Sequence, residues 1–373
     1  MGMDYIILLI YLGGLLVLSI LKRKELEWIG PIYGKRIRNV LFLEKIYKKV
    51  KRPVKFFQYI SLFLMFFLIG YSYFSILGYL VKCLKKEVKS VGVSLLIPGM
   101  RIPGTQIKVP LIEGLISIFL VILTHELAHA IIALERGESI KSIGIGVLGF
   151  IPVAFVELGK ELSPEKNPKD ALFILSAGPT TNFLIALLFL CLLPIPSYLF
   201  KISSQEGGVK IIKVEDFRKG IFTPGEVIKE INGTKIKNTF SLLNFLRKYN
   251  HSVTLEILTN KGKKYVKTIV RENRSYIGIY GITNYVPKSK KFLPLFFLSK
   301  FFYSLFYWIY FINLAVCLIN AYPIPFFDGG GFFAAFLKLF INRKRLYSIL
   351  LLVVFMINIA LLSATIILPL MAR

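Results

Sequence analysis

Residues 114–134 read GLISIFLVILTHELAHAIIAL, an apolar run with only three ionisable side chains, His125, Glu126 and His129. As a helix, this run is long enough to cross the ~30 Å hydrocarbon core of a bilayer, which takes about 20 residues. Ionisable groups at that depth are costly without a partner, and a bound cation would satisfy all three together. The stretch therefore predicts a membrane-spanning fold and a metal site. The alternative, a polar cluster that packs helices, would need separate partners for each group.

The spacing of these three residues is typical of a zinc hydrolase. On a helix, histidines at i and i+4 lie on one face, about 6 Å apart along the axis, which suits two ligands of one zinc ion. Glu126 is next to the first ligand and could reach an attacking water without being a ligand, which is the position of a general base. The remaining histidine, His251, lies in a polar segment, and we expect it to be an ordinary surface residue.

A catalytic zinc site takes three protein ligands and a water, so a third ligand is needed. Residues 295–337 carry only two charges, Lys300 and Asp328, and are too many for one span. The stretch NAYPIPFFDGG at 320–330 must interrupt them, because its two prolines end a helix. Asp328 could cap the next helix, but a carboxylate among phenylalanines near membrane depth is better explained by a cation. The predicted site is His125, His129 and Asp328 with one Zn²⁺ per chain.

The composition excludes most soluble classes. Of 373 residues, 55% are hydrophobic and 18% are charged, fewer than the roughly 25% of soluble domains. Intrinsic disorder is excluded for the same reason. The net charge of +27 comes from basic residues beside apolar runs, which indicates anionic lipid headgroups and membrane topology, not nucleic acid. Three cysteines without ligand spacing indicate no disulfide framework.

Apolar windows predict a polytopic α-helical membrane protein with about six transmembrane helices. The windows are residues 4–21, 56–81, 113–134, 171–193, 301–320 and 346–370. Between the first two, Lys22 to Lys55 contains twelve basic residues against three glutamates, so the positive-inside rule places this segment in the cytoplasm. Alternation then places the N-terminus and residues 194–300 outside. Residues 139–158 are too apolar for a cytoplasmic loop, and we expect a re-entrant β-hairpin there.

Residues 207–284 have a different character, with short alternating strands at 209–214, 253–258 and 264–270 and a helix at 240–248. Within them, PGEVIKEING at 224–233 reads as a strand that ends in an Asn-Gly turn. This pattern resembles the signature of PDZ domains, although any small β-rich module is the alternative. We expect a small α+β PDZ-like domain outside the membrane, which either binds peptide or only excludes bulky substrates.

Several motifs together resemble the site-2 protease family of intramembrane zinc metalloproteases. HELAH in a span is followed by NAYPIPFFDGG, with AGPTTN at 177–182 and the PDZ-like insert between them. IPGM at 97–100 and GFIPVAFVE at 149–157 are similar to the branch that includes the animal enzymes. The resemblance covers roughly residues 95–345.

The resemblance implies roles for individual residues. His125, His129 and Asp328 would be the zinc ligands and Glu126 the catalytic acid/base. Asn182 and Asn320 fall on the family's asparagine positions, which hold the unwound substrate backbone or steady the reaction centre. From the residues alone, each asparagine is equally well a hydrogen-bonding group between helices.

These inferences give four domains. Residues 1–90 form an N-terminal anchor region, 91–200 the first half of the protease core, 203–285 the PDZ-like domain, and 292–373 the second half with the third ligand.

The predicted function is zinc-dependent hydrolysis of peptide bonds in or near transmembrane segments, that is, regulated intramembrane proteolysis. The expected protein is a multi-pass protein of the cell membrane whose partners are transmembrane substrates and membrane lipids. Nothing in the sequence indicates an oligomeric state. One alternative is a transporter or metal channel, which would need ionisable residues on several helices along the transport path. The other alternative is a non-proteolytic scaffold that binds membrane partners through the insert. Such a scaffold would be expected to lose the base, Glu126.

Overall fold

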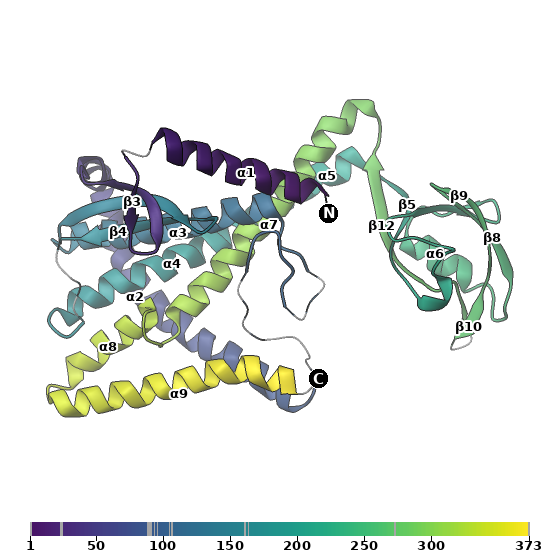
Figure 1. Ribbon diagram of the computed structural model, residues 1–373. Helices are drawn as coiled ribbons and strands as arrows, with labels where there is room; N and C mark the ends of the chain where they lie inside the picture. Colours follow the sequence, from purple (N-terminus) through teal and green to yellow (C-terminus); the bar gives the residue numbers. More distant parts are fainter. Residues whose placement is uncertain are drawn as a thin grey trace. The chain divides into compact units, whose positions relative to one another are not determined.

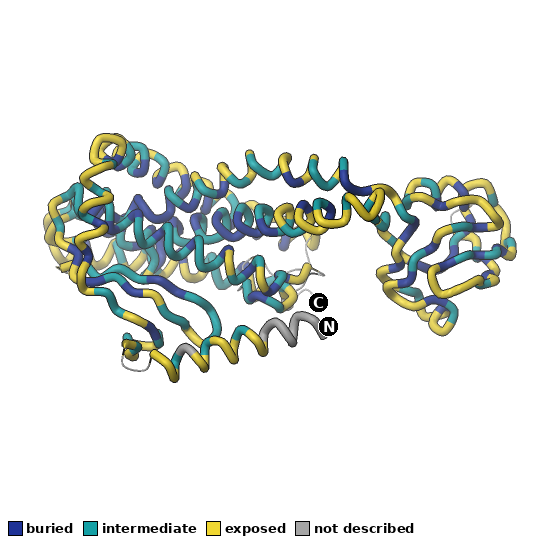
Figure 2. The backbone as a smooth tube through the Cα atoms, turned by 90° about the horizontal axis from the view of Figure 1, so that it is seen from above, coloured by how far each residue is buried: buried dark blue, intermediate teal, exposed yellow. Residues whose placement is uncertain are grey.

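The computed structural model describes residues 2–22, 25–87, 92, 94, 96–103, 105, 107–159, 162, 164–271 and 274–371 (Figure 1). The chain divides into two compact units. We call Met1–Leu193 with Ser304–Arg373 the membrane unit, and Pro194–Tyr303 the insert unit. In both units buried, half-buried and exposed residues alternate along the helices and strands (Figure 2).

Five helices in the described part of the chain are long and apolar enough to cross a membrane. They are Leu41–Leu84, Leu111–Glu135, Pro168–Ser203, Lys290–Ala321 and Lys344–Pro369. Four of them contain a predicted window and the fifth covers the window 346–370 up to Pro369, which confirms a polytopic helical membrane protein. The first predicted window, residues 4–21, coincides with helix α1 (Gly2–Leu21), of which Leu9–Leu21 is a shorter apolar helix. The described residues therefore give five candidate spans where the sequence predicts six.

The helices of the membrane unit pack through small and apolar side chains. Besides α1, they are α2 (Leu41–Leu84), α3 (Leu111–Glu135), α4 (Pro168–Leu192), the part of α7 (Leu293–Ala321) from Ser304 onward, α8 (Asp328–Phe340) and α9 (Lys344–Met371). Met65, Ala171 and Phe332 belong to one buried cluster that joins α2, α4, α7 and α8. The hydroxyl groups of Ser61 and Ser176 lie 3.0 Å apart and hydrogen bond between α2 and α4. Such small polar residues let helix backbones approach closely in lipid.

A four-stranded antiparallel sheet lies beside α3 in the membrane unit (Figure 1). Its order is β1 (Glu27–Ile29), β2 (Ile32–Ile37), β3 (Ile140–Leu148) and β4 (Ile151–Leu158). β3 and β4 form the predicted hairpin, whereas β1 and β2 lie in the basic segment and were not predicted. β4 is the last strand in this order, so it forms an edge of the sheet with no further strand partner among the described residues.

The insert unit is a β-sheet domain with one short helix against it. The sheet order is β12 (Ile279–Pro287), β5 (Ser204–Val214), β6 (Val227–Ile231), β8 (Thr254–Thr259) and β9 (Gly262–Lys267), with β7 (Thr234–Lys235) paired to β6. β10 (Ile269–Arg271) and β11 (Arg274–Tyr276) form a separate hairpin, and α5 (Pro194–Ser203) precedes the sheet.

The predicted strands at 209–214 and 253–258 and the predicted helix are confirmed within a few residues, whereas the predicted strand at 264–270 divides into β9 and β10, which belong to different sheets. The helix is α6 (Thr239–Leu246), whose cap Asn238 accepts a hydrogen bond from the Ser241 backbone N–H at 2.7 Å. Asn232 and Gly233, with φ of 45° and 75°, make the predicted turn after β6. A single apolar core, which includes Val209, Ile228 and Ile257, supports the sheet.

Candidate metal centre

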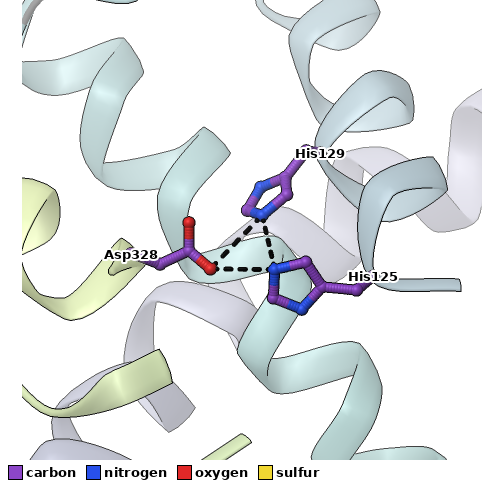
Figure 3. A group of neighbouring side chains, drawn as sticks. All are labelled: His125, His129 and Asp328. Atoms are coloured by element: carbon purple, nitrogen blue, oxygen red, sulfur yellow. Dashed lines mark hydrogen bonds and ion pairs between the residues drawn. The ribbon is translucent and has the colours of Figure 1, made fainter. Parts of the chain in front are cut away.

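Two turns of α3 present His125 and His129 to the start of α8 (Figure 3). The Nε2 atoms of the two imidazoles lie 3.1 Å apart. The Oδ2 atom of Asp328 lies 2.9 Å from Nε2 of His125 and 3.4 Å from Nε2 of His129. The three potential ligand atoms all lie within 4.8 Å of one another. The fold thus brings together the three side chains that the sequence predicts as ligands.

The break between α7 and α8 places Asp328 at this point. α7 ends at Ala321, and α8 begins at Asp328 after the Pro323-Ile-Pro325 segment, as the prolines predict. The N-cap position is occupied by Phe327, without a side-chain capping bond, so the capping interpretation of Asp328 is wrong. Its carboxylate points toward the imidazoles instead (Figure 3).

The two glycines after Asp328 make the close approach of α8 possible. A Cβ atom at Gly329 would collide with the backbone of Ala321, and one at Gly330 with the carbonyl of Ile324. Only residues without a side chain therefore allow the first turn of α8 to pack against the end of α7.

Each histidine makes a hydrogen bond through Nδ1, the ring nitrogen that does not contact Asp328. Nδ1 of His129 lies 2.7 Å from the carbonyl oxygen of Ile174, to which Nδ1–H donates. This tautomer leaves the Nε2 lone pair free to bind a metal.

Asn182 plays the corresponding part for His125. Its amide nitrogen lies 3.0 Å from Nδ1 of the ring, and its buried Oδ1 has no hydrogen-bond partner among the described residues. The two ends of an amide have nearly the same shape. Turned by 180°, this amide presents Oδ1 to an Nδ1–H group and frees Nε2 of His125 for coordination. This bond joins α4 to α3, so Asn182 is a hydrogen-bonding group between helices, and its partner is one of the predicted ligands.

The space around the two rings depends on Gly178 in α4. A Cβ atom at this position would lie 2.5 Å from Cε1 of His125 and 2.5 Å from Nε2 of His129. The site offers two imidazole nitrogens and one carboxylate oxygen, with the tautomers of both rings fixed, and Gly178 leaves space beside the rings. This arrangement fits a zinc ion with an open coordination position.

Glu126 and Asn320, the two other predicted residues near this site, line the same pocket as the three potential ligands. The pocket has a volume of about 400 Å³. Its apolar wall includes Val156 and Leu158 from β4. The pocket therefore has both polar and apolar lining residues, as ligand sites usually do. His251 is exposed in the insert unit, as predicted.

Asn358 in α9 is a supporting residue that our sequence interpretation missed. Its Nδ2 donates to the carbonyl of Pro323 at 2.7 Å, and its Oδ1 accepts from the hydroxyl of Tyr73 at 2.9 Å. The hydroxyl of Tyr322 donates to the Asn358 carbonyl at 3.2 Å. These bonds hold the segment that carries Asp328. A single amide in an apolar span is a signal that could have found it.

Comparison with known proteins agrees with this geometry. The sequence model of peptidase family M50 matches residues 113–364, a range that includes His125, His129 and Asp328. An uncharacterized protein of Methanocaldococcus jannaschii is 32% identical over 266 residues, which cover 66% of this chain and 67% of that protein. The chain therefore belongs to peptidase family M50, the site-2 protease family of membrane metallopeptidases.

Proposed function

We propose that this protein is an intramembrane zinc metalloprotease that hydrolyses peptide bonds in or near the transmembrane segments of other membrane proteins. One observation carries the proposal: His125, His129 and Asp328, from distant parts of the chain, converge in a pocket that Glu126 also lines. When bound there, zinc supplies a Lewis acid and lowers the pKa of water toward ~7.

Glu126 acts as the general base and acid in this proposal. It takes the proton from the attacking water and later delivers it to the leaving amine. Asn182 and the Ile174 carbonyl keep His125 and His129 in the orientation that ligation needs. Asn320, in the pocket wall, hydrogen bonds the backbone of the bound substrate.

The substrate must lose helical structure before it is cut, because the backbone of a transmembrane helix is shielded by its own hydrogen bonds. β4 is an edge strand with no second strand partner among the described residues, and it lies beside the site because Val156 and Leu158 line the pocket. An unwound segment that adds to this edge as a further strand would present its peptide bonds to the metal position.

The insert unit is, in this proposal, a PDZ-like domain on the extracytoplasmic side. The basic segment at 22–55 supports that orientation through the positive-inside rule. The domain controls which substrates approach, either by binding a peptide or by excluding bulky ectodomains. A chain without residues 203–285 should then cleave full-length substrates that the intact protein rejects; unchanged selectivity would contradict a filtering role.

Glu126→Gln tests the proposed reaction. Cleavage of single-span peptides in detergent should vanish, while zinc content stays near that of the wild-type protein, because Gln keeps the shape of Glu and leaves the ligands intact. Cleavage that survives the substitution would contradict the assignment. Metal transport or partner binding by a wild-type protein that cuts no peptide would favour the transporter or the scaffold.

A further inference from the structure

Phe326 has a backbone conformation that its side chain opposes. Its φ is +71°, in the left-handed region, and its ring is fully exposed. A bulky side chain in this region costs free energy that glycine or asparagine would largely avoid. Residues in such conformations cluster at functional sites, where the surrounding structure maintains them.

The local fold explains the turn at Phe326 but not the aromatic ring. After the turn, Phe327 packs beside Tyr322 and Ile324 in a buried cluster, and Asp328 reaches the two histidines. A glycine at position 326 would allow the same change of direction without strain. The ring contributes to none of the buried clusters in the described part of the chain.

The ring does have a place in the pocket. Phe326 lines it together with His125, Glu126 and Asp328, and the apolar wall includes Val156 and Leu158 of β4. The left-handed turn therefore keeps a large apolar surface exposed next to the residues proposed to carry out the chemistry. An exposed aromatic ring gains free energy when a partner side chain covers it.

We propose that Phe326 is a specificity-determining residue that contacts a substrate side chain adjacent to the scissile bond. It favours a bulky apolar side chain there, because only such a side chain covers the ring and excludes water from the pocket. This inference rests on the proposed protease function and adds a sequence preference to it. Discrimination of a large from a small apolar side chain by such a contact is about 10-fold or more in kcat/KM.

A peptide library measures this preference directly. The probe is a set of single-span peptides in detergent, with alanine, leucine or phenylalanine at each position that flanks the cleaved bond. Wild-type protein should cleave the leucine and phenylalanine peptides about 10-fold faster than the alanine peptides at one of these positions. Phe326→Gly should remove most of the difference, mainly through KM, and Phe326→Leu should retain part of it.

Stability separates the proposed role from a structural one. Because glycine relieves the strain at φ +71°, Phe326→Gly should unfold at a temperature no lower than the wild type and keep its zinc content. The matched control is Phe340→Ala, since Phe340 is an exposed phenylalanine at the end of α8 that does not line the pocket. Its preference should equal that of the wild type. A Phe326→Gly protein that unfolds earlier or loses zinc would overturn the inference.

A binding measurement distinguishes failure of this inference from failure of the protease assignment. p-Benzoyl-phenylalanine placed at position 326 of the Glu126→Gln protein should crosslink to the leucine peptide, whereas the same group at position 340 should not. Cleavage by the wild type with an unchanged preference in Phe326→Gly, or equal crosslinking from both positions, overturns the inference alone. A wild type that neither cuts nor crosslinks any peptide overturns both.

Discussion

The membrane unit and the insert unit each withdraw a carboxylate from solvent, but they satisfy it differently. Glu226 in the insert is completely buried, and Lys264 Nζ lies 2.7 Å from its Oε1. Thr259 donates to the same carboxylate at 2.6 Å, and the backbone N–H of Thr223 at 3.1 Å. Asp328 has a side-chain exposure of 16%, and its ion pairs with described residues are both to histidines.

The difference shows what each site needs. Glu226 belongs to a closed network in which a lysine ammonium supplies the positive charge, so the protein itself completes the site. The partners of Asp328 are imidazoles, which are neutral when they act as metal ligands, and the pocket beside them is open. A site of this second kind is completed by a cation from outside the chain.

Gly178→Ala should impair the metal site severely, with the largest effect among the supporting residues. The added Cβ would overlap rings that Asn182 and the Ile174 carbonyl prevent from moving away. We expect loss of bound zinc and at least a ~100-fold loss of peptide cleavage, comparable to removing a supporting group of a metal site. Gly70→Ala is the control, since a Cβ at Gly70 on α2 meets no atom within 4 Å. Full zinc content in Gly178→Ala would contradict the geometry.

Asn182→Ala should weaken the same site less. Loss of the hydrogen bond to Nδ1 of His125 frees the ring, and we expect zinc affinity to fall by about 10- to 100-fold. The measurement is competition for zinc with a chelator of known affinity. Asn313→Ala is the matched control, because Asn313 is also a buried asparagine, but its one side-chain bond to a described residue is to the Ile309 carbonyl of its own helix. Equal losses in both variants would argue against a positioning role.

Asn358→Leu should have a smaller effect, because Asn358 contacts the segment before Asp328 and none of the three potential ligands. Without its amide, the Pro323 carbonyl loses a donor, and the segment before Asp328 is held less firmly. We expect a drop in cleavage of roughly 10-fold with a smaller change in zinc affinity. Tyr73→Phe removes only the hydroxyl that donates to Asn358 and should have a weaker effect. A larger effect from Tyr73→Phe would contradict this order.

Glu226 should control the pH stability of the insert and leave the metal site unchanged. Burial raises the pKa of this carboxyl group, but bonds from Lys264 and Thr259 outweigh burial and lower it below the ordinary 4.5. The folded pKa is thus depressed, so the stabilisation is complete above about pH 4.5 and is lost as the pH falls through the lower folded value. Hydrogen exchange of the insert in the full-length protein, measured relative to the intrinsic rate at each pH, should show less protection as the pH falls below about 4.5.

Glu226→Gln gives the complementary test of the closed network. The substitution leaves Lys264 without its carboxylate and should destabilise the insert by roughly 3 kcal/mol at neutral pH. Its acid-dependent loss of stability should be smaller than that of the wild type, while zinc content stays the same. A variant with wild-type stability would show that the buried pair contributes nothing net.

Two parts of the site that sequence could predict are local, and one is not. His125 and His129 share a face because they are four residues apart on one helix, whatever the rest of the fold does. Pro323 and Pro325 end α7 for an equally local reason. The meeting of Asp328 with the histidines could be predicted because few other partners can satisfy a carboxylate in an apolar segment.

The parts that were missed depend on pairing between distant segments. β2 carries Lys35 and Arg36, so its sequence reads as a solvated basic segment, and only its pairing with β3 makes it a strand. A different kind of exception is local: α2 continues through Pro53, although a proline usually ends a helix. Asn358 acquires its role from contact with Pro323, and neither residue alone reveals that contact.

The most direct test of the central claim is the zinc environment of the purified full-length protein, measured by metal analysis and zinc X-ray absorption. The wild type should hold about one zinc with two imidazole nitrogens at about 2.0–2.1 Å and oxygen ligands from Asp328 and water. Asp328→Ala should lose most of this zinc, while His251→Ala, which changes the exposed histidine of the insert, should keep it. A wild type without imidazole-bound zinc, or an Asp328→Ala protein with unchanged zinc affinity and coordination, would contradict the account.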